Sequence, residues 1–299
     1  MKITIAGASG FVGTALARQL LDSGHVVTGL GTSTSHPLEA VADFTWHSAD
    51  TTRSGAWQDA VREADTVVNL AGRTIFKRWS SAYKRQISDS RILTTRNIVG
   101  ALAGEGQTLL SASAVGFYGS RGDETLTETS PPGADFLANL SVDWEQAALA
   151  AQVRGVRVAV MRFGVVLGLG GGALAQMLPA FRMFAGGPLG NGQQWFSWIH
   201  LSDLLAAIQF LMHQETACGP YNFCAPGPVR QREFARSLGA VLKRPVFFPA
   251  PAMALRLMLG EVAGVVLASQ KVLPNRLIAD GFRFGFADID SALTNLVRQ

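Results

Sequence analysis

Apolar and polar positions follow two different periods along the first part of the chain. Short apolar runs at 3–6, 25–30 and 65–72 have the length and composition of buried strands. Between the first two runs, 11–21 carries apolar side chains at helical spacing, and Gly24 follows where a helix is expected to end. The pattern therefore predicts strand, helix, strand from the beginning of the chain.

The same alternation continues to residue 163. The patterns predict helices at 84–102 and 142–153, and strands at 108–113 and 156–163. Strands that alternate with helices favour a parallel sheet with right-handed crossovers. The expected fold class is α/β, a Rossmann-type doubly wound parallel sheet.

The glycine and proline content of the sequence rises after Phe163. The next thirty residues are rich in glycine, and the segments beyond Pro226 are short and separated by prolines. A helix is expected at 204–213, with Ser202 or Asp203 as its N-cap. We therefore expect a small C-terminal cap domain over the sheet. The predicted division is a Rossmann domain of 1–163 and 195–225, and a substrate-binding cap of 164–194 and 226–299.

Composition narrows the class of protein. A chain of 299 residues with 48% hydrophobic and 16% charged residues is typical of a globular protein. The formal charge of +4 is scattered, so neither nucleic acid nor a membrane is an expected partner, and the charges within 249–273 argue against a membrane span. Two cysteines and dispersed histidines favour a reduced, cytoplasmic protein without a metal site.

Three glycines mark the junction between the first strand and the first helix. Gly7, Gly10 and Gly13 stand three residues apart, and this strand–loop–helix context separates a dinucleotide loop from a chance match. Backbone N–H groups and the positive end of the helix dipole would face a diphosphate there. A tight turn without a ligand is the alternative. The predicted contacts with the cofactor in this loop are Gly7, Ser9, Gly10, Phe11, Val12 and Gly13.

The end of the second strand bears on which dinucleotide binds. NAD sites place an acidic residue here to accept hydrogen bonds from the ribose hydroxyls. This chain has Thr32 and Ser33 instead, which offer hydroxyls to a 2′-phosphate and no carboxylate to repel it. The pattern favours NADP over NAD, although no arginine stands at this point.

Longer motifs carry a resemblance to a known family. Beside the glycine spacing, they include NLAG at 69–72, SASAVGFYG at 111–119, GGAL at 171–174 and QWFSWIH at 194–200. With these motifs, the chain resembles the atypical, extended short-chain dehydrogenases/reductases of the sugar-nucleotide-epimerase-like family. The resemblance covers nearly the whole chain and implies NADP(H) binding. Family members often have Ser-Arg where this chain has Gly31-Thr32, so a strict preference for NADP does not follow.

The resemblance also implies contacts with the cofactor outside the glycine loop. Leu70 and Ala71 would pass beside the adenosine. For Arg91 and Arg162, an ion pair within the protein is the alternative. The full set of these implied contacts is Leu70, Ala71, Gly72, Arg91, Ser111 and Arg162.

The catalytic set that is typical of the family is incomplete. Ser113 fits the position of the serine that orients the substrate oxygen. The helix that should carry Tyr-x-x-x-Lys has Leu137 and Ser141 at those positions, when it is aligned on Glu145. Tyr118 is a candidate substitute acid, with a packing tyrosine as the alternative reading. The aromatic segment 193–200 either lines a substrate cleft or packs the cap against the sheet.

Two function classes remain open from the sequence. The first is an NADP-dependent, epimerase-like oxidoreductase acting on a small molecule, such as a nucleotide-sugar or a carbonyl compound. The second is a non-catalytic NADP(H)-binding protein that senses redox state or binds another protein. The missing Tyr and Lys favour the second class, and the expected substrate cleft favours the first.

Overall fold

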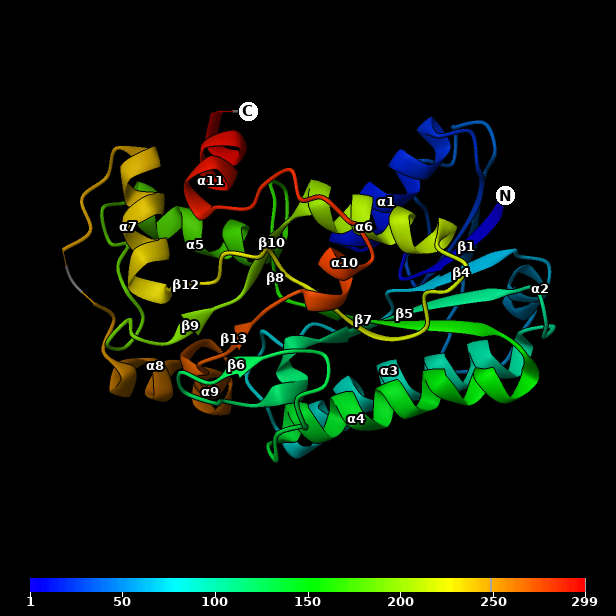
Figure 1. The fold of residues 1–299 in the computed structure, drawn as a ribbon, viewed down its shortest axis with the longest axis horizontal. Coiled ribbons are helices and arrows are strands. Elements are labelled where there is room, and N and C mark those ends of the chain that lie inside the picture. Colours follow the sequence, from blue (N-terminus) through cyan, green and yellow to red (C-terminus); the bar gives the residue numbers. More distant parts are fainter. Residues whose placement is uncertain (248, 299) are drawn as a thin grey trace.

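A seven-stranded parallel sheet forms the centre of the molecule in this computed structural model, which describes residues 1–247 and 249–298 (Figure 1). The strand order is β11-β7-β5-β4-β1-β2-β3. Each neighbouring pair is parallel, so the carboxyl ends of all seven strands meet at one edge. The strands are β1 Lys2–Ala6, β2 Val26–Gly31, β3 Phe44–Ser48, β4 Thr66–Asn69, β5 Thr108–Ala114, β7 Arg157–Phe163 and β11 Gly219–Phe223.

Helices cover both faces of this sheet, as Figure 1 shows. On one face α1 (Phe11–Asp22) and α6 (Leu201–His213) pack together through a buried cluster that includes Leu16, Leu20 and Ile208. The opposite face is covered by α2 (Trp57–Arg62), α3 (Ser81–Ala101) and α4 (Phe136–Leu149), with the short helix η2 (Ala150–Arg154) after α4. The strands are buried on both sides, as expected of a doubly wound α/β fold.

A second group of elements lies at the end of the molecule remote from β1, β2 and β3 (Figure 1). Its core joins three helices, and Trp198 and Phe234 lie at its centre. The helices are α5 Gly172–Arg182, α7 Gln231–Leu242 and α11 Ile289–Arg298. Its short strand pairs are β8 Val165–Leu167 with β10 Trp198–His200, and β9 Trp195–Phe196 with β12 Val229–Arg230.

The chain between α7 and α11 runs back toward the sheet. After α8 (Ala252–Leu259), η3 (Gly260–Val262) and α9 (Ala263–Leu267), the strand β13 (Lys271–Val272) pairs with β6 (Thr125–Leu126). Leu277 in α10 (Asn275–Ala279) then joins the core beneath α1 and α6. The C-terminal segment therefore contributes to both cores, and the division into two domains stays a prediction.

The sequence predicted five of the seven strands of the main sheet and the helices α1, α3, α4 and α6, with two clear errors. The predicted strands and helices up to residue 163 are present, but α4 begins at Phe136 rather than at 142, because the Asp135 side chain caps it by accepting from the Ala138 N–H at 2.9 Å. The prediction that Ser202 or Asp203 caps α6 is wrong. The helix begins at Leu201, and the His200 ring accepts the capping hydrogen bond. Among the described residues, no helix is long and apolar enough to cross a membrane.

Candidate functional site

The glycine loop between β1 and α1 has the geometry of an anion site. Gly7 has a φ of +81°, and its N–H donates to the Leu30 carbonyl oxygen at 2.9 Å. A Cβ on Gly13 would stand 2.2 Å from the Gly7 carbonyl oxygen. Gly10 is the N-cap of α1 without a side-chain cap, and the first turn has no acidic residue. The N–H groups at this helix end are therefore available to a negatively charged group.

Phe11 connects this loop to the glycine-rich segment that follows β8. Its ring packs against the backbone of Gly168 and Gly171, where a Cβ would stand 2.7 and 2.5 Å from ring atoms. The glycines at 168 and 171 thus allow the chain to pass closely over the start of α1. Side chains at these positions would separate the two segments.

Thr32 and Ser33 follow β2 and are exposed beside the glycine loop. A Cβ on the preceding Gly31 would stand 2.9 Å from the Ser9 hydroxyl oxygen, so the two loops are in contact. The Trp46 indole N–H donates to the Ser33 carbonyl at 3.2 Å. Next to it the buried His36 ring lies 3.1 Å from the Ala8 carbonyl oxygen. These two aromatic side chains position the loop after β2.

Sequence reasoning missed this role of Trp46 and His36. Trp46 stands in β3, which the pattern of apolar residues did not predict, and His36 follows β2 by five residues. The available signal was the pair of aromatic rings at Phe44 and Trp46, which alternate as in a half-buried strand.

Arg91 reaches from α3 to the chain that follows β4. Its guanidinium lies beside Gly72, where a Cβ would stand 3.0 Å from its central carbon, and it donates to the Arg73 carbonyl oxygen at 3.0 Å. It also lies over the Trp144 ring at 5.2 Å. Burial lowers the pKa of Arg91 to about 10. No carboxylate within residues 1–247 and 249–298 forms an ion pair with it, so this desolvated cation suits an anionic ligand.

Leu70, Ala71 and Gly72 continue from the carboxyl end of β4 toward Arg91. The loop is held by Asn69, whose side-chain oxygen accepts from the Ala71 N–H at 3.2 Å. The Asn69 side-chain nitrogen lies 3.4 Å from the hydroxyl oxygen of Ser111, which is buried within β5. The Ser111 hydroxyl thus contacts Asn69 inside the sheet.

Ser113 and Arg162 belong to one buried network at the carboxyl end of β5 and β7. Both hydrogen-bond to Glu145 of α4. The Ser113 hydroxyl donates to Glu145 Oε1 at 2.6 Å, and Arg162 donates from Nε and Nη2 to the two carboxylate oxygens at 2.8 and 2.7 Å. This two-point ion pair is almost fully buried. Burial lowers the pKa of Arg162, but the hydrogen bonds to Glu145 outweigh that effect, and the pKa of Arg162 is raised.

Tyr118 is the third predicted site residue in this network. Its hydroxyl accepts from Arg162 at 3.0 Å and donates to the Asn222 side-chain oxygen at 2.6 Å. The side chain is fully buried, and burial raises the pKa of Tyr118 to about 12. The Tyr118 hydroxyl therefore both donates and accepts a hydrogen bond within the protein.

The positions of the expected Tyr and Lys do not form a proton relay. Leu137 places its side chain against Gly116, whose Cβ would stand 3.6 Å from the Leu137 Cβ, and Ser141 is buried. Lys84 is a cation in the first turn of α3. Its ammonium lies over the rings of Trp79 and Phe136, at 5.6 and 5.2 Å.

Lys84 also forms an ion pair with Glu261 in η3, so it links α3 to the C-terminal segment. A second link connects β12 to the loop before β6, because Arg230 pairs with Asp123 at 2.7 Å. The Trp195 indole N–H donates to the same Asp123 oxygen at 3.0 Å, and Arg230 covers the Trp195 ring at 4.1 Å. These contacts hold the second group of elements against the carboxyl edge of the sheet.

Most of the aromatic segment 193–200 serves packing. Trp198 is fully buried, with its indole N–H on the Gly227 carbonyl oxygen at 3.0 Å, and Phe196 packs on Phe234 with ring centres 4.6 Å apart. His200 caps α6 and stacks on Phe286 at 4.0 Å. Trp195 is the partly exposed aromatic of this segment that faces the loop before β6.

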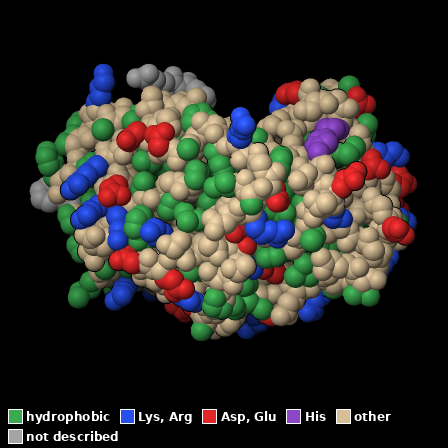
Figure 2. All heavy atoms as spheres, viewed as in Figure 1, with side chains coloured by type: hydrophobic (Ala, Val, Ile, Leu, Met, Phe, Trp, Pro, Cys, Tyr) green, Lys and Arg blue, Asp and Glu red, His purple; other side chains and the backbone are tan. Residues whose placement is uncertain are grey.

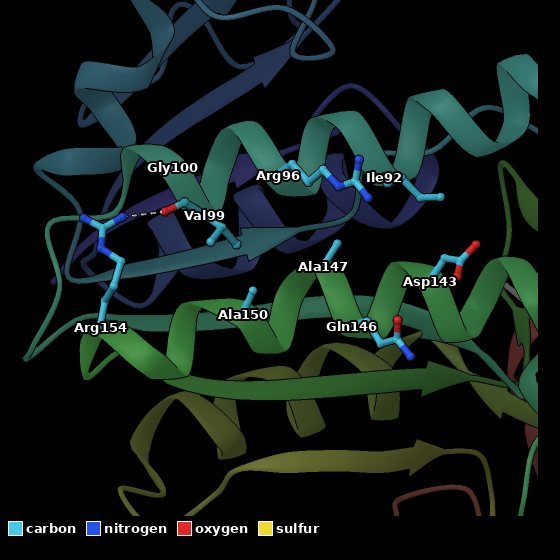
Figure 3. Close-up of a pocket in the computed structure, with 9 residues that line it drawn as sticks. All are labelled: Ile92, Arg96, Val99, Gly100, Asp143, Gln146, Ala147, Ala150 and Arg154. Atoms are coloured by element: carbon cyan, nitrogen blue, oxygen red, sulfur yellow. Dashed lines mark hydrogen bonds between the residues drawn. The ribbon is translucent and has the colours of Figure 1, made fainter.

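A separate hollow of about 650 Å³ lies between α3 and α4 (Figure 3). Ile92, Val99 and Ala147 form its apolar floor, and Arg96 and Asp143 stand at its rim. It lies along the two helices rather than at the strand edge that carries the glycine loop and the Ser113 network (Figures 1 and 3). It therefore adds nothing to the site described above.

Known proteins match nearly the whole chain. The family model described as "NAD dependent epimerase/dehydratase family" matches residues 3–224, and a domain of unknown function, DUF1731, matches residues 250–296. The epimerase family protein SDR39U1 homolog, chloroplastic, of Arabidopsis thaliana is 41% identical over 100% of this chain and 87% of its own. An epimerase family protein of Staphylococcus aureus is 38% identical over 99% of this chain and 98% of its own.

Among solved structures, the human epimerase family protein SDR39U1 (isoform 2) with NADPH superposes with a TM-score of 0.87. It is 30% identical, and the match covers 100% of both chains. The similarity thus extends over the sheet, the helices on both faces and the second group of elements.

Proposed function

Because this chain belongs to the NAD dependent epimerase/dehydratase family, we propose that it is an epimerase-like oxidoreductase that binds NADP(H). The human relative that was crystallised with NADPH supports this choice of cofactor. Thr32 and Ser33 support it within this chain, since they offer exposed hydroxyls where NAD sites have a carboxylate. The proposed substrate is a small molecule, either a nucleotide-sugar or a carbonyl compound.

The observation that carries the proposal is the uncapped start of α1 together with Arg91, which has no carboxylate as an ion-pair partner in the part of the chain that the structure describes. The N–H groups after Gly10 hold the diphosphate, and Gly13 lets the helix lie close enough to do so. Leu70 and Ala71 line the adenosine side. When NADP(H) is bound, its nicotinamide donates or accepts a hydride.

Ser113 is the proposed contact with substrate, and Glu145 positions its hydroxyl. Arg162 holds the Glu145 carboxylate in place through the two-point pair. The role of Tyr118 as an acid stays a prediction. Its burial and its two protein partners favour the other reading, in which it positions Arg162.

A non-catalytic NADP(H)-binding redox sensor is the second candidate. Leu137 and Ser141 favour it, because neither can replace the phenol and ammonium of the usual dyad. A screen of carbonyl compounds and nucleotide-sugars against NADPH, followed by nicotinamide absorbance, separates the two. Turnover that is lost in Ser113→Ala supports the enzyme, and cofactor binding without turnover of any compound supports the sensor.

The cofactor proposal is tested by titrating NADPH and NADH and following nicotinamide fluorescence. Wild type is expected to bind NADPH more tightly, and Arg91→Gln is expected to bind it about tenfold more weakly, since a charge-assisted contact is lost. Arg96→Gln is the matched control, because Arg96 is exposed on the same helix at the separate hollow. If Arg91→Gln binds NADPH like wild type, Arg91 has no part in the site.

A further inference from the structure

Large apolar side chains are concentrated on the exposed surface around α8. No residue of this helix is fully buried, and Met253 and Leu257 are 83% and 81% exposed. Apolar patches of this kind on a protein surface mark interaction sites more often than scattered single residues do. The exposed set, called the α8 face below, comprises Phe76, Met183, Phe184, Phe247, Met253, Leu257 and Met258.

These residues come from separate segments that the fold brings together. The chain at Leu189 pairs with Ala250, immediately before α8, with the Gly190 N–H on the Ala250 carbonyl oxygen at 2.8 Å. The Arg244 guanidinium lies over the Phe184 ring at 4.5 Å. The segment after α5 therefore runs beside the chain that leads into α8.

The loop that carries Phe76 adjoins the other end of α8. Arg78 lies 3.7 Å from the position of a Cβ on Gly260, the residue that ends the helix. Lys84 pairs with Glu261 one residue further on. The α8 face thus extends from the end of α5, across α8, to the loop before α3.

Two segments that contribute to the α8 face carry an excess of cations. Between Glu233 and Glu261 the sequence has four cations, at 236, 243, 244 and 256, and no acidic residue. Between Asp65 and Asp89 it has five cations and no acidic residue. Glu261 itself is engaged by Lys84. Lysine and arginine side chains lie among hydrophobic ones at this end of the molecule in Figure 2.

We infer that the α8 face docks on an anionic lipid surface. A short apolar helix flanked by cations buries methionine, leucine and phenylalanine at the headgroup boundary while the cations meet lipid charges. A second copy of the chain is a poorer occupant, because a two-fold contact would bring the same set of cations together. The lack of a spanning helix in the described residues concerns passage through a bilayer, and docking at its surface needs none.

The experiment is cosedimentation of the full chain with phosphatidylcholine vesicles, with and without phosphatidylglycerol. The apolar variant is Leu257→Ser with Met258→Ser, and the charge variant is Arg256→Gln with Arg182→Gln. Arg182 is exposed in the last turn of α5, next to Met183 of the α8 face. Val153→Ser is the matched control, since Val153 is 93% exposed in η2, outside the α8 face. Circular dichroism on each variant tests whether the fold is kept, and NADPH titration tests whether cofactor binding is kept.

Wild type and the Val153 control are expected to bind only the vesicles that contain phosphatidylglycerol, and more weakly as salt rises. Both α8-face variants are expected to bind these vesicles at least about tenfold more weakly than wild type, since buried apolar area and positive charge each contribute to binding. Absence of wild-type binding, or equal binding by the apolar variant, overturns the inference. So does a wild-type dimer that the apolar variant dissociates, since the face would then join two copies. NADPH affinity is measured separately, so failure of this inference leaves the proposed function intact.

Discussion

Gly13 is a position where one methyl group decides whether the cofactor loop keeps its shape. A Cβ there would meet the Gly7 carbonyl oxygen at 2.2 Å, which is backbone that cannot rotate away. Gly13→Ala is expected to weaken NADPH binding by about tenfold or more, since overpacking typically costs about 1–3 kcal/mol. Fluorescence titration with NADPH measures this loss.

Gly100→Ala is the control for that substitution. Gly100 is helical in α3, and a Cβ there would meet nothing within 4 Å. It is expected to raise the free energy of unfolding by about 0.5–1 kcal/mol and to leave NADPH affinity unchanged. Equal affinities of the Gly13 variant and wild type would show that the loop does not hold the cofactor.

Tyr118→Phe tests whether that hydroxyl serves stability or chemistry. Its removal leaves the Asn222 side-chain oxygen and an Arg162 N–H without this partner in a buried site. The expected loss in free energy of unfolding is about 1–3 kcal/mol, measured by urea denaturation, with NADPH affinity retained. Tyr83→Phe, whose hydroxyl reaches the Thr74 carbonyl near the surface, is expected to change little. Abolished turnover with unchanged stability would instead identify Tyr118 as the acid.

At the same scale, the sequence predicted individual residues but not their partners. It left Arg162 with two readings, a cofactor contact or an ion pair within the protein. The structure places it in the ion pair with Glu145, and nothing yet tests a contact with the cofactor. Glu145 and Arg162 stand on α4 and β7, and they meet only because that helix packs over the strand. Such a pairing has no periodicity that a sequence pattern could show.

Among the elements, strands with continuous apolar runs were predictable and the others were not. Residues 3–6 and 108–113 read as buried strands, and β1 and β5 are there. The edge strand β11 of the main sheet contains Gly219 and Pro220, which are turn formers, so its sequence does not suggest a strand. It forms because it pairs with β7 at the sheet edge, which is a tertiary contact.

The cap of α6 gives this element a dependence on pH. The His200 ring accepts from the Ser202 N–H at 3.1 Å, and burial lowers its pKa, an effect that the charge of Asp203 partly opposes. A histidine with a lowered pKa in the folded state stabilises the fold above its unfolded pKa of about 6.5. That contribution is lost as the pH falls through the folded value.

His200→Asn is therefore expected to flatten the decline in stability between neutral and mildly acidic pH, because asparagine caps helices without titrating. Urea denaturation at a series of pH values measures the slope. Burial also lowers the pKa of His25, which is present in both proteins, so the difference between the slopes reports His200. Parallel curves would show that protonation of His200 does not couple to folding.

On the scale of the whole molecule, hydrogen bonds and two ion pairs connect the C-terminal segment and the second group of elements to the sheet. Gln270 donates to the Val115 and Gly119 carbonyl oxygens at 3.0 and 3.1 Å, and Asp203 accepts from the Gly285 and Phe286 N–H groups at 2.9 Å. Arg230 with Asp123 and Lys84 with Glu261 are exposed or partly exposed pairs, which are each worth little in water. Burial of Leu277 and pairing of β13 with β6 add to them. The cofactor proposed to bind at the strand edge would add its own binding free energy to the folded molecule.

NADPH is therefore expected to raise the melting temperature. A ligand at a hundred times its Kd adds about 2.7 kcal/mol, which corresponds to about 5 °C or more in a chain of this size. Thermal denaturation with NADPH, with NADH and with neither measures the shift. A smaller shift with NADH at the same concentration follows from the proposed preference, and no shift with either nucleotide contradicts the proposal.

The hydrogen bond between Ser113 and Glu145 has a consequence for what the serine can recognise. A hydroxyl has one proton, and Ser113 gives it to Glu145 Oε1 at 2.6 Å. In the proposed function, where Ser113 contacts substrate, this oxygen would present lone pairs alone to that substrate. A bound alcohol, which can donate, satisfies it, whereas a ketone, which can only accept, faces it oxygen to oxygen. In the proposed function Ser113 would therefore favour the reduced form of a substrate, and Glu145 would be the residue that sets this preference.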